Sequence, residues 1–165
     1  MKRFSLLLLL PLLLFCGCRK KQVEMPNPVV ESSPQEIQEL LGITFGIPKD
    51  AENIYYSIIA GKLAQMDFVW QEAECTARVK ASTTTELEDI SGFYYEWKQE
   101  VEIPVGYNTA TVRWLETKEG DTIGICIWQD IVPGLTYSVS MEKNATLENL
   151  FILANAVYIP VQGDS

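Results

Sequence analysis

Cysteines and carboxylates are the side chains through which this chain could carry nucleophilic, redox or metal chemistry, because its 165 residues include no histidine. The lack of histidine removes the commonest general base near neutral pH and every Ser–His or Cys–His nucleophile pair. Of the four cysteines, Cys75 and Cys126 lie in the body of the sequence. In an oxidising compartment two thiols permit one disulfide. We therefore expect either a disulfide between Cys75 and Cys126 or two buried free thiols.

The carboxylates do not form a pattern typical of a metal site or of a catalytic pair. The densest acidic run, 86–89, lacks the spacing of a calcium loop, and a short helical turn capped by Thr85 explains it better. Glycosidase chemistry needs two facing carboxyl groups. Asp130, beside Trp128, is the single acid that we would assign to such a pair. We therefore predict no catalytic residue, no metal ligand and no cofactor, and expect a protein that is not an enzyme.

The amino terminus has the pattern of an export signal. Lys2 and Arg3 precede an almost wholly apolar stretch over 4–15, which is too short for the roughly 20 residues of a membrane-spanning helix. The stretch ends at Cys16-Gly17-Cys18, which resembles the bacterial lipobox, in which a small residue precedes a lipidated cysteine. The resemblance implies cleavage after Gly17 and a diacylglyceryl thioether on Cys18. The alternative is an ordinary leader whose cleavage releases a soluble protein.

The remaining sequence divides into a spacer, one domain and a tail. We predict a lipoprotein signal peptide at 1–17, the lipidated cysteine with a flexible proline-rich spacer at 18–33, a single domain at 34–160 and a disordered tail at 161–165. Removing the leader takes two of the 13 basic residues and none of the 22 acidic ones, so the mature net charge is -11. Such an acidic chain repels phosphate backbones, which argues against a nucleic-acid partner.

Alternating segments dominate the predicted domain, which we expect to be α+β. Period-two alternation predicts strands at 73–81, 93–103 and 135–142, and further strands are expected at 54–60, 63–70, 107–115 and 122–129. A helix is predicted to begin at Pro34 and to stop at Gly42, and a closing helix covers 145–156 with Asn144 or Thr146 as its cap. The prediction is a curved antiparallel sheet of about seven strands in a meander, with the two helices on one face.

The aromatic residues are numerous, and most must fill the core of such a sheet. A minority of them could line a ligand groove between the sheet and the helices. The candidates for this groove are Trp70, Trp97, Trp114 and Trp128.

Five segments resemble an uncharacterised family of Gram-positive exported proteins, whose domain of unknown function occurs on lipoproteins and on the outer side of anti-sigma-factor-like membrane proteins. They are Gly46-Ile47-Pro48, Ala51–Ile54, Leu87–Trp97, Cys126–Asp130 and Leu135–Val139. The match spans roughly 35 to 157. The resemblance implies an extracytoplasmic α+β domain and assigns no chemistry to any residue.

Two functional hypotheses follow. The first is a non-enzymatic binding or sensing domain, anchored in the cell membrane by its lipid, with an envelope protein or cell-wall component as partner. The second is a carrier for a lipid or another apolar small molecule.

Overall fold

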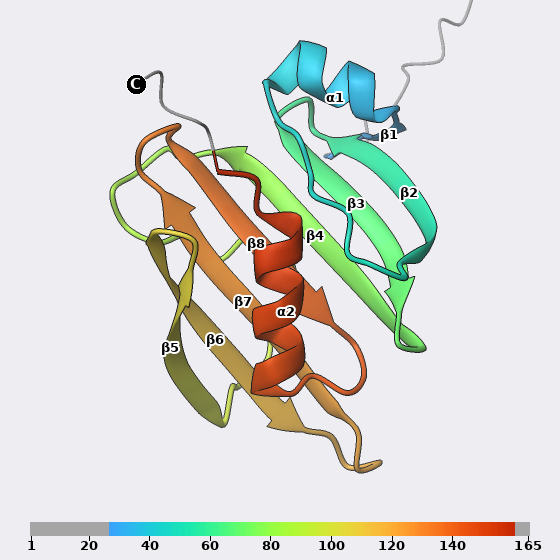
Figure 1. Ribbon diagram of the computed structural model, residues 1–165, viewed down its shortest axis with the longest axis vertical. Helices are drawn as coiled ribbons and strands as arrows, with labels where there is room; N and C mark the ends of the chain where they lie inside the picture. Colours follow the sequence, from blue (N-terminus) through green and yellow to red (C-terminus); the bar gives the residue numbers. More distant parts are fainter. Residues whose placement is uncertain (1–26, 161–165) are drawn as a thin grey trace, which may run out of the picture.

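The alternating segments of the sequence form one eight-stranded antiparallel sheet in the computed structural model, which describes residues 27–160 (Figure 1). The leader, Cys18 and the predicted tail lie outside the described residues. In chain order the elements are β1 (Val29–Glu31), α1 (Pro34–Leu41), β2 (Glu52–Ile59), β3 (Leu63–Trp70), β4 (Ala73–Ala81), β5 (Gln99–Val105), β6 (Asn108–Glu116), β7 (Thr122–Asp130), β8 (Leu135–Met141) and α2 (Leu147–Val157).

The sheet consists of two meanders that meet at β8. The strand order is β1-β2-β3-β4-β8-β7-β6-β5, so the last strand, and not β5, pairs with β4. The α+β class and the antiparallel sheet are therefore confirmed, but the single meander of about seven strands is wrong. The additional strand is β1, which lies inside the predicted spacer. Its three residues are all exposed, so no alternation marks it in the sequence.

The two helices begin where short polar side chains cap them. Ser33 accepts from the N–H of Glu36, whose carboxylate accepts from the N–H of Ser33 in turn, and α1 ends at Gly42 in the left-handed conformation. Of the two candidate caps for α2, Thr146 accepts from the N–H of Asn149. Only α2 lies across the sheet, over β7 and β8, whereas α1 lies beside the edge near β1 and β2 (Figure 1). The expectation of both helices on one face is corrected accordingly.

The core lies between α2 and the sheet face that it covers. From α2, the fully buried side chains are Leu150, Leu153, Ala154 and Val157. They face the inward side chains of the central strands, which include Ala77, Val112, Cys126 and Val139. The segment 43–51 extends this layer, since Gly46 donates to the carbonyl of Val157 over 2.9 Å. A Cβ at Gly46 would lie 2.0 Å from the carbonyl oxygen of Ala156, so a glycine is required for this approach.

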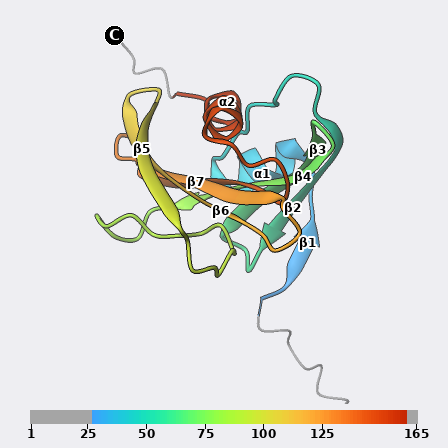
Figure 2. The same ribbon diagram turned by 90° about the horizontal axis from the view of Figure 1, so that it is seen from below.

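The opposite face of the sheet, here called the outer face, is covered in part by the irregular segment 82–98 (Figure 2). On this side the buried strand residues include Ile123, Ile125 and Ile127 of β7 and Thr136, Ser138 and Ser140 of β8. Strand β7 is therefore covered on both faces, which agrees with the apolar residues that point to each side of this strand. The alternation at 135–142 predicts one solvent-exposed face for β8, and its three buried hydroxyl side chains contradict this prediction.

The tight turns agree with the sequence. Gln71 and Glu72 both have positive φ angles, as a two-residue hairpin turn requires, and Pro133-Gly134 lies in the turn between β7 and β8. Among residues 27–160, no helix is long and apolar enough to span a membrane.

Candidate functional site

The segment 88–95 is fixed on the outer face by two arginines. Arg78 of β4 donates from Nη1 to the carbonyl oxygens of Ser91 at 2.7 Å and Ile90 at 3.2 Å. Arg113 of β6 lies 3.7 Å from a carboxylate oxygen of Asp89. The carboxylate of Asp89 also accepts from the N–H and the hydroxyl of Ser91, so it stiffens the segment from within. An irregular chain thus acquires a defined position without pairing as a strand.

Gly92 permits the close approach of this segment to β4. Its φ of 77° is left-handed, and a Cβ built on it would lie 2.1 Å from Nη1 of Arg78. A side chain at this position would therefore displace the guanidinium group that holds the segment.

Arg78 belongs to a hydrogen-bonded row across the outer face. Its Nε donates to Gln65, whose amide donates to the carboxylate of Asp67, and each bond is 2.7 Å long. Thr76 donates to the other oxygen of Asp67. Burial lowers the pKa of the Arg78 guanidinium, and the nearby carboxylates of Asp67 and Asp89 oppose this change. Since arginine stays protonated in proteins, Arg78 remains a cation.

Two clefts border the segment 88–95 and a third adjoins one of them, and together the three form what we call the furrow. A cleft of about 520 Å³ is lined by Gly92, Phe93, Tyr94, Tyr95, Ile123 and Glu142. Gly92 and Tyr94 are shared with a second cleft of about 380 Å³, which extends toward the turn between β2 and β3. Glu142 is shared with a third of about 290 Å³, whose lining includes Tyr55, Asp67, Glu74 and Thr76. The shared residues make the furrow continuous.

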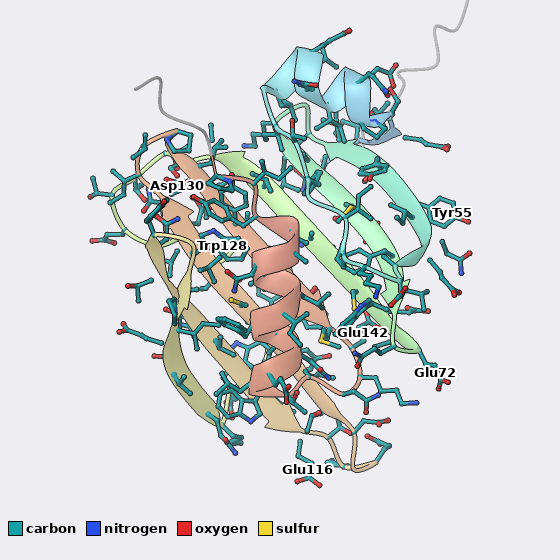
Figure 3. All side chains as sticks on the ribbon, in the orientation of Figure 1. Tyr55, Glu72, Glu116, Trp128, Asp130 and Glu142 are labelled. Atoms are coloured by element: carbon teal, nitrogen blue, oxygen red, sulfur yellow. The ribbon has the colours of Figure 1, made fainter. Side chains whose placement is uncertain are left out.

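The furrow presents tyrosines and carboxylates to solvent. Tyr94 is 96% exposed, Tyr55 is 64% exposed and Tyr95 is 50% exposed. Glu74 and Glu142 are exposed neighbours, joined by a backbone hydrogen bond of 3.0 Å, and Figure 3 shows Glu142 at the end of β8. Within residues 27–160, neither glutamate forms an ion pair. Of the three clefts, only the second is lined by basic side chains, which are Lys62, Arg78 and Lys80. At Glu74 and Glu142 the furrow is thus an aromatic surface with negative charge that no ion pair compensates.

The predicted strand at 93–103 forms only in its second half. Residues 93–97 are irregular, and the strand β5 begins at Gln99. The alternation still has a structural basis, since the rings of Phe93 and Tyr95 lie 5.9 Å apart and those of Tyr95 and Trp97 lie 5.6 Å apart. These three rings form a row in an extended chain.

Cys75 and Cys126 are both buried free thiols, so the structure does not form the disulfide that was one of the two alternatives. Cys75 is paired with Met141 of β8, and Cys126 is paired with Val139 of the same strand. Strand β8 therefore lies between the strands that carry the two thiols. Two spacings between neighbouring strands amount to about 10 Å, which is too far for a disulfide. Burial raises the pKa of each thiol to about 12, which suppresses the reactive thiolate.

The four tryptophans of the predicted groove do not surround one space. Trp128 is fully buried against Tyr137, Trp114 lies partly buried on β6, and Trp97 belongs to the outer-face row. Trp70 alone of the four lines a cleft described here, and its indole donates to the carbonyl of Lys49 over 2.9 Å. This cleft of about 590 Å³ is bordered by Pro48, Asp50, Glu52, Val69, Glu72, Ile152 and Ala156. The single four-tryptophan groove is therefore wrong.

Asp130 lies in a buried aromatic cluster and not in a carboxylate pair. Its carboxylate accepts from the hydroxyl of Tyr158 at 2.6 Å and from the N–H of Val132 at 3.2 Å. Trp128 stacks on Tyr137 with ring centroids 5.0 Å apart. Burial raises the pKa of Tyr137, and the nearby carboxylate of Asp130 raises it further. The cluster connects the end of α2 to β7 and β8, which is a structural role (Figure 3).

The acidic run 86–89 is also structural. The segment forms no helical turn, so the expected cap at Thr85 is wrong. Glu88 pairs instead with Lys80 at 2.6 Å. Among the described residues, no group of three or more His, Cys, Asp or Glu side chains could hold a metal ion.

Comparison with family models, curated proteins and solved structures finds no match to this chain. The furrow was not foreseen from the sequence, because its residues come from segments distant in the chain. The one local signal was Gly92, which follows the compact run Asp89-Ile90-Ser91 and precedes two tyrosines.

Proposed function

We propose that this protein is a lipid-anchored, extracytoplasmic binding domain without enzymatic activity, and that the furrow takes a cationic segment of an envelope protein or cell-wall peptide. The observation that carries the proposal is the furrow itself, where exposed tyrosines adjoin carboxylates that have no basic partner in the described chain. Aromatic rings and carboxylates together favour lysine or arginine side chains, through cation–π and charge attraction. The mature net charge of -11 acts in the same direction at long range.

The anchor is tested by comparing Cys18→Ser with Cys16→Ser in cells that are fed labelled palmitate. Both changes remove one cysteine from the same motif, but we expect only Cys18→Ser to abolish labelling and to release the protein from the membrane fraction. Equal labelling of the two variants, or an unprocessed precursor in the wild type, would contradict the lipoprotein hypothesis.

The binding face is tested with a fluorescent octalysine peptide and the exported chain at low salt. The double variant Glu74→Gln/Glu142→Gln removes two charges from the furrow. The control, Glu116→Gln/Glu119→Gln, removes two exposed charges from the end of β6 and the turn that follows it. Each exposed charge pair contributes about 0.5–1 kcal/mol at most, so two pairs correspond to about a five- to thirtyfold loss of affinity. Equal losses in both variants would mean that only net charge attracts the peptide.

The aromatic part of the furrow has its own control. Tyr94 and Tyr107 are both 96% exposed, but only Tyr94 lines the furrow. We expect Tyr94→Ala to weaken peptide binding and Tyr107→Ala to leave it unchanged. If Tyr94→Ala has no effect, the tyrosines of the furrow do not contribute to recognition.

The cleft beside Trp70 supports the second hypothesis, an apolar ligand held between the sheet and α2. Its lining combines Val69, Ile152 and Ala156 with the edge of the indole ring. We therefore propose it as the place where a carrier function would be found. Native mass spectrometry of protein purified without detergent tests this directly, because a carried lipid adds mass that Ile152→Glu should remove. Wild-type protein that carries no added mass would leave this hypothesis without support.

A further inference from the structure

One end of the sheet combines the start of the described chain with exposed apolar side chains. We call it the anchored end, and it comprises the chain start at 27–28 and the turns 60–62, 106–107 and 131–134. The N–H of Ala60 donates to the carbonyl of Pro28 over 2.9 Å, which joins the chain start to the first turn. Strand registers place the other two turns at the same end. Leu63 pairs with Lys80, which pairs with Thr136 of β8, and Ala110 at the start of β6 pairs with Trp128 near the end of β7.

The exposed apolar residues of this end are large and contiguous in the chain. Ile131 is 83% exposed and Val132 is 88% exposed, although neither belongs to the furrow or to the core. Tyr107, in the turn between β5 and β6, is almost completely exposed. Isolated apolar residues on a surface need no explanation, but consecutive ones at the tip of a turn are typical of a contact site.

Charge distinguishes the two ends of the sheet. The turns of the anchored end contain Lys62 and no aspartate or glutamate. The turns at the far end, 71–72, 117–121 and 142–146, contain four exposed acidic residues, Glu72, Glu119, Asp121 and Glu142, and two exposed lysines, Lys118 and Lys143, so that their net charge is negative. Figure 3 shows Glu72 and Glu116 away from Asp130, the residue that immediately precedes Ile131. An anionic bilayer would therefore repel the far end and tolerate the anchored end.

The length of the connecting chain leads to the same orientation. Eight residues lie between Cys18 and Asn27, so the connection can span at most about 30 Å, which is also about the length of a nine-residue strand. To place the far end on the membrane, the connection would have to run back along the whole sheet. The anchored end needs no such extension.

We infer that the turn Ile131-Val132 rests in the surface of the bilayer that holds the lipid anchor, so that the domain stands on this end and directs the acidic end of the furrow, at Glu74 and Glu142, away from the membrane. This inference depends on the proposed lipidation of Cys18. Helix α1, which carries the exposed Glu36 and Glu39, also lies toward this end, so the contact is confined to the side that carries the β7–β8 turn (Figure 1). The occupant is the lipid interface, where isoleucine and valine side chains bury apolar area.

The test uses the lipidated full-length protein in vesicles of phosphatidylcholine and phosphatidylglycerol. A single NBD fluorophore is attached at Val132→Cys or, as the control, at Lys118→Cys, which lies in an exposed turn of the far end. Cys75 and Cys126 are buried and do not compete for the label in the folded state. Lipids that carry a spin label near the headgroup quench only probes in the interface. We expect the NBD fluorescence to fall by at least about half at position 132 and by no more than about one tenth at position 118.

Two outcomes would overturn the inference, and they differ in what else they affect. If mass spectrometry shows the diacylglyceryl group on Cys18 but position 132 is quenched no more than position 118, the orientation is wrong and the lipoprotein proposal stands. If Cys18 carries no lipid, both the proposed anchor and the orientation fail. Unchanged urea midpoints of the two labelled variants would show that neither label disturbs the fold.

Discussion

Replacing Gly92 by alanine should detach the segment 88–95 from the sheet. The change has two physical consequences, because φ at this residue is 77° and because the new Cβ would lie 2.1 Å from Nη1 of Arg78. Gly120→Ala is a matched control. Gly120 has a φ of 86° in the turn after β6, and a Cβ there meets no atom within 4 Å. The control therefore carries the backbone strain alone.

The expected difference follows from the contacts of Arg78. Placing alanine in the left-handed region costs about 1–2 kcal/mol in either variant. In Gly92→Ala the guanidinium must also leave the carbonyl oxygens of Ser91 and Ile90, and a hydrogen bond from a charged donor contributes about 1.5–3 kcal/mol. Water replaces part of this loss, so we count one bond and expect about 2 kcal/mol beyond the control. The free energy of unfolding should fall by about 3–4 kcal/mol for Gly92→Ala.

Urea unfolding of both variants measures this difference, and limited chymotrypsin digestion locates it. Once the segment detaches, cleavage after Tyr94 and Tyr95 should become rapid in Gly92→Ala, while Gly120→Ala should resist digestion as the wild type does. Equal loss of stability in the two variants, with equal digestion, would refute the argument that Arg78 holds the segment.

Three further predictions concern the core and the cap of α2. The thiols of Cys75 and Cys126 should resist labelling at pH 8 in the native state and react fully in urea. Because the pKa of each thiol rises from 9 in the unfolded chain to about 12 when buried, the free energy of unfolding should decline from pH 9 upward by about 1.4 kcal/mol per pH unit for each thiol. The decline should be less steep in the double alanine variant. Tyr158→Phe removes the bond to the buried carboxylate of Asp130 and should cost about 1.5–3 kcal/mol by urea titration, with much of the loss recovered when Asp130→Asn is added. Thr146→Ala should destabilise the protein by about 1 kcal/mol in thermal unfolding, whereas Thr146→Ser, which keeps the hydroxyl acceptor of the α2 cap, should be nearly neutral.

Local patterns predicted the individual elements well. The alternation of Ala73, Cys75, Ala77 and Val79 gives β4, whose inner side chains are all buried, and the Ser33-Pro34 start and the Gly42 stop of α1 are confirmed. The order of the strands was not predictable in the same way. Pairing of β4 with β8 depends on contacts between residues more than 50 positions apart, and no local feature of either strand distinguishes β8 from β5 as a neighbour.

The candidate site was harder to predict, because its residues acquire their roles only in three dimensions. Arg78 occupies a polar position of an alternating strand, where an arginine is ordinarily a solvated side chain, but here the segment 88–95 covers it. The buried hydroxyl groups of β8 follow from the same coverage. Asp130 did attract attention in the sequence through its apolar neighbours, and the structure places it in a cluster of tyrosines without a second carboxylate.

The central position of β8 has a consequence for how the chain can be completed. Until residues 135–141 are available, β4 and β7 each present an unpaired strand edge, and neither meander has its neighbour. Such edges pair readily with other chains. Synthesis or secretion that halts before this strand would therefore leave two half-sheets with unpaired edges, and residues 135–141 decide whether these edges pair within the chain or with other chains.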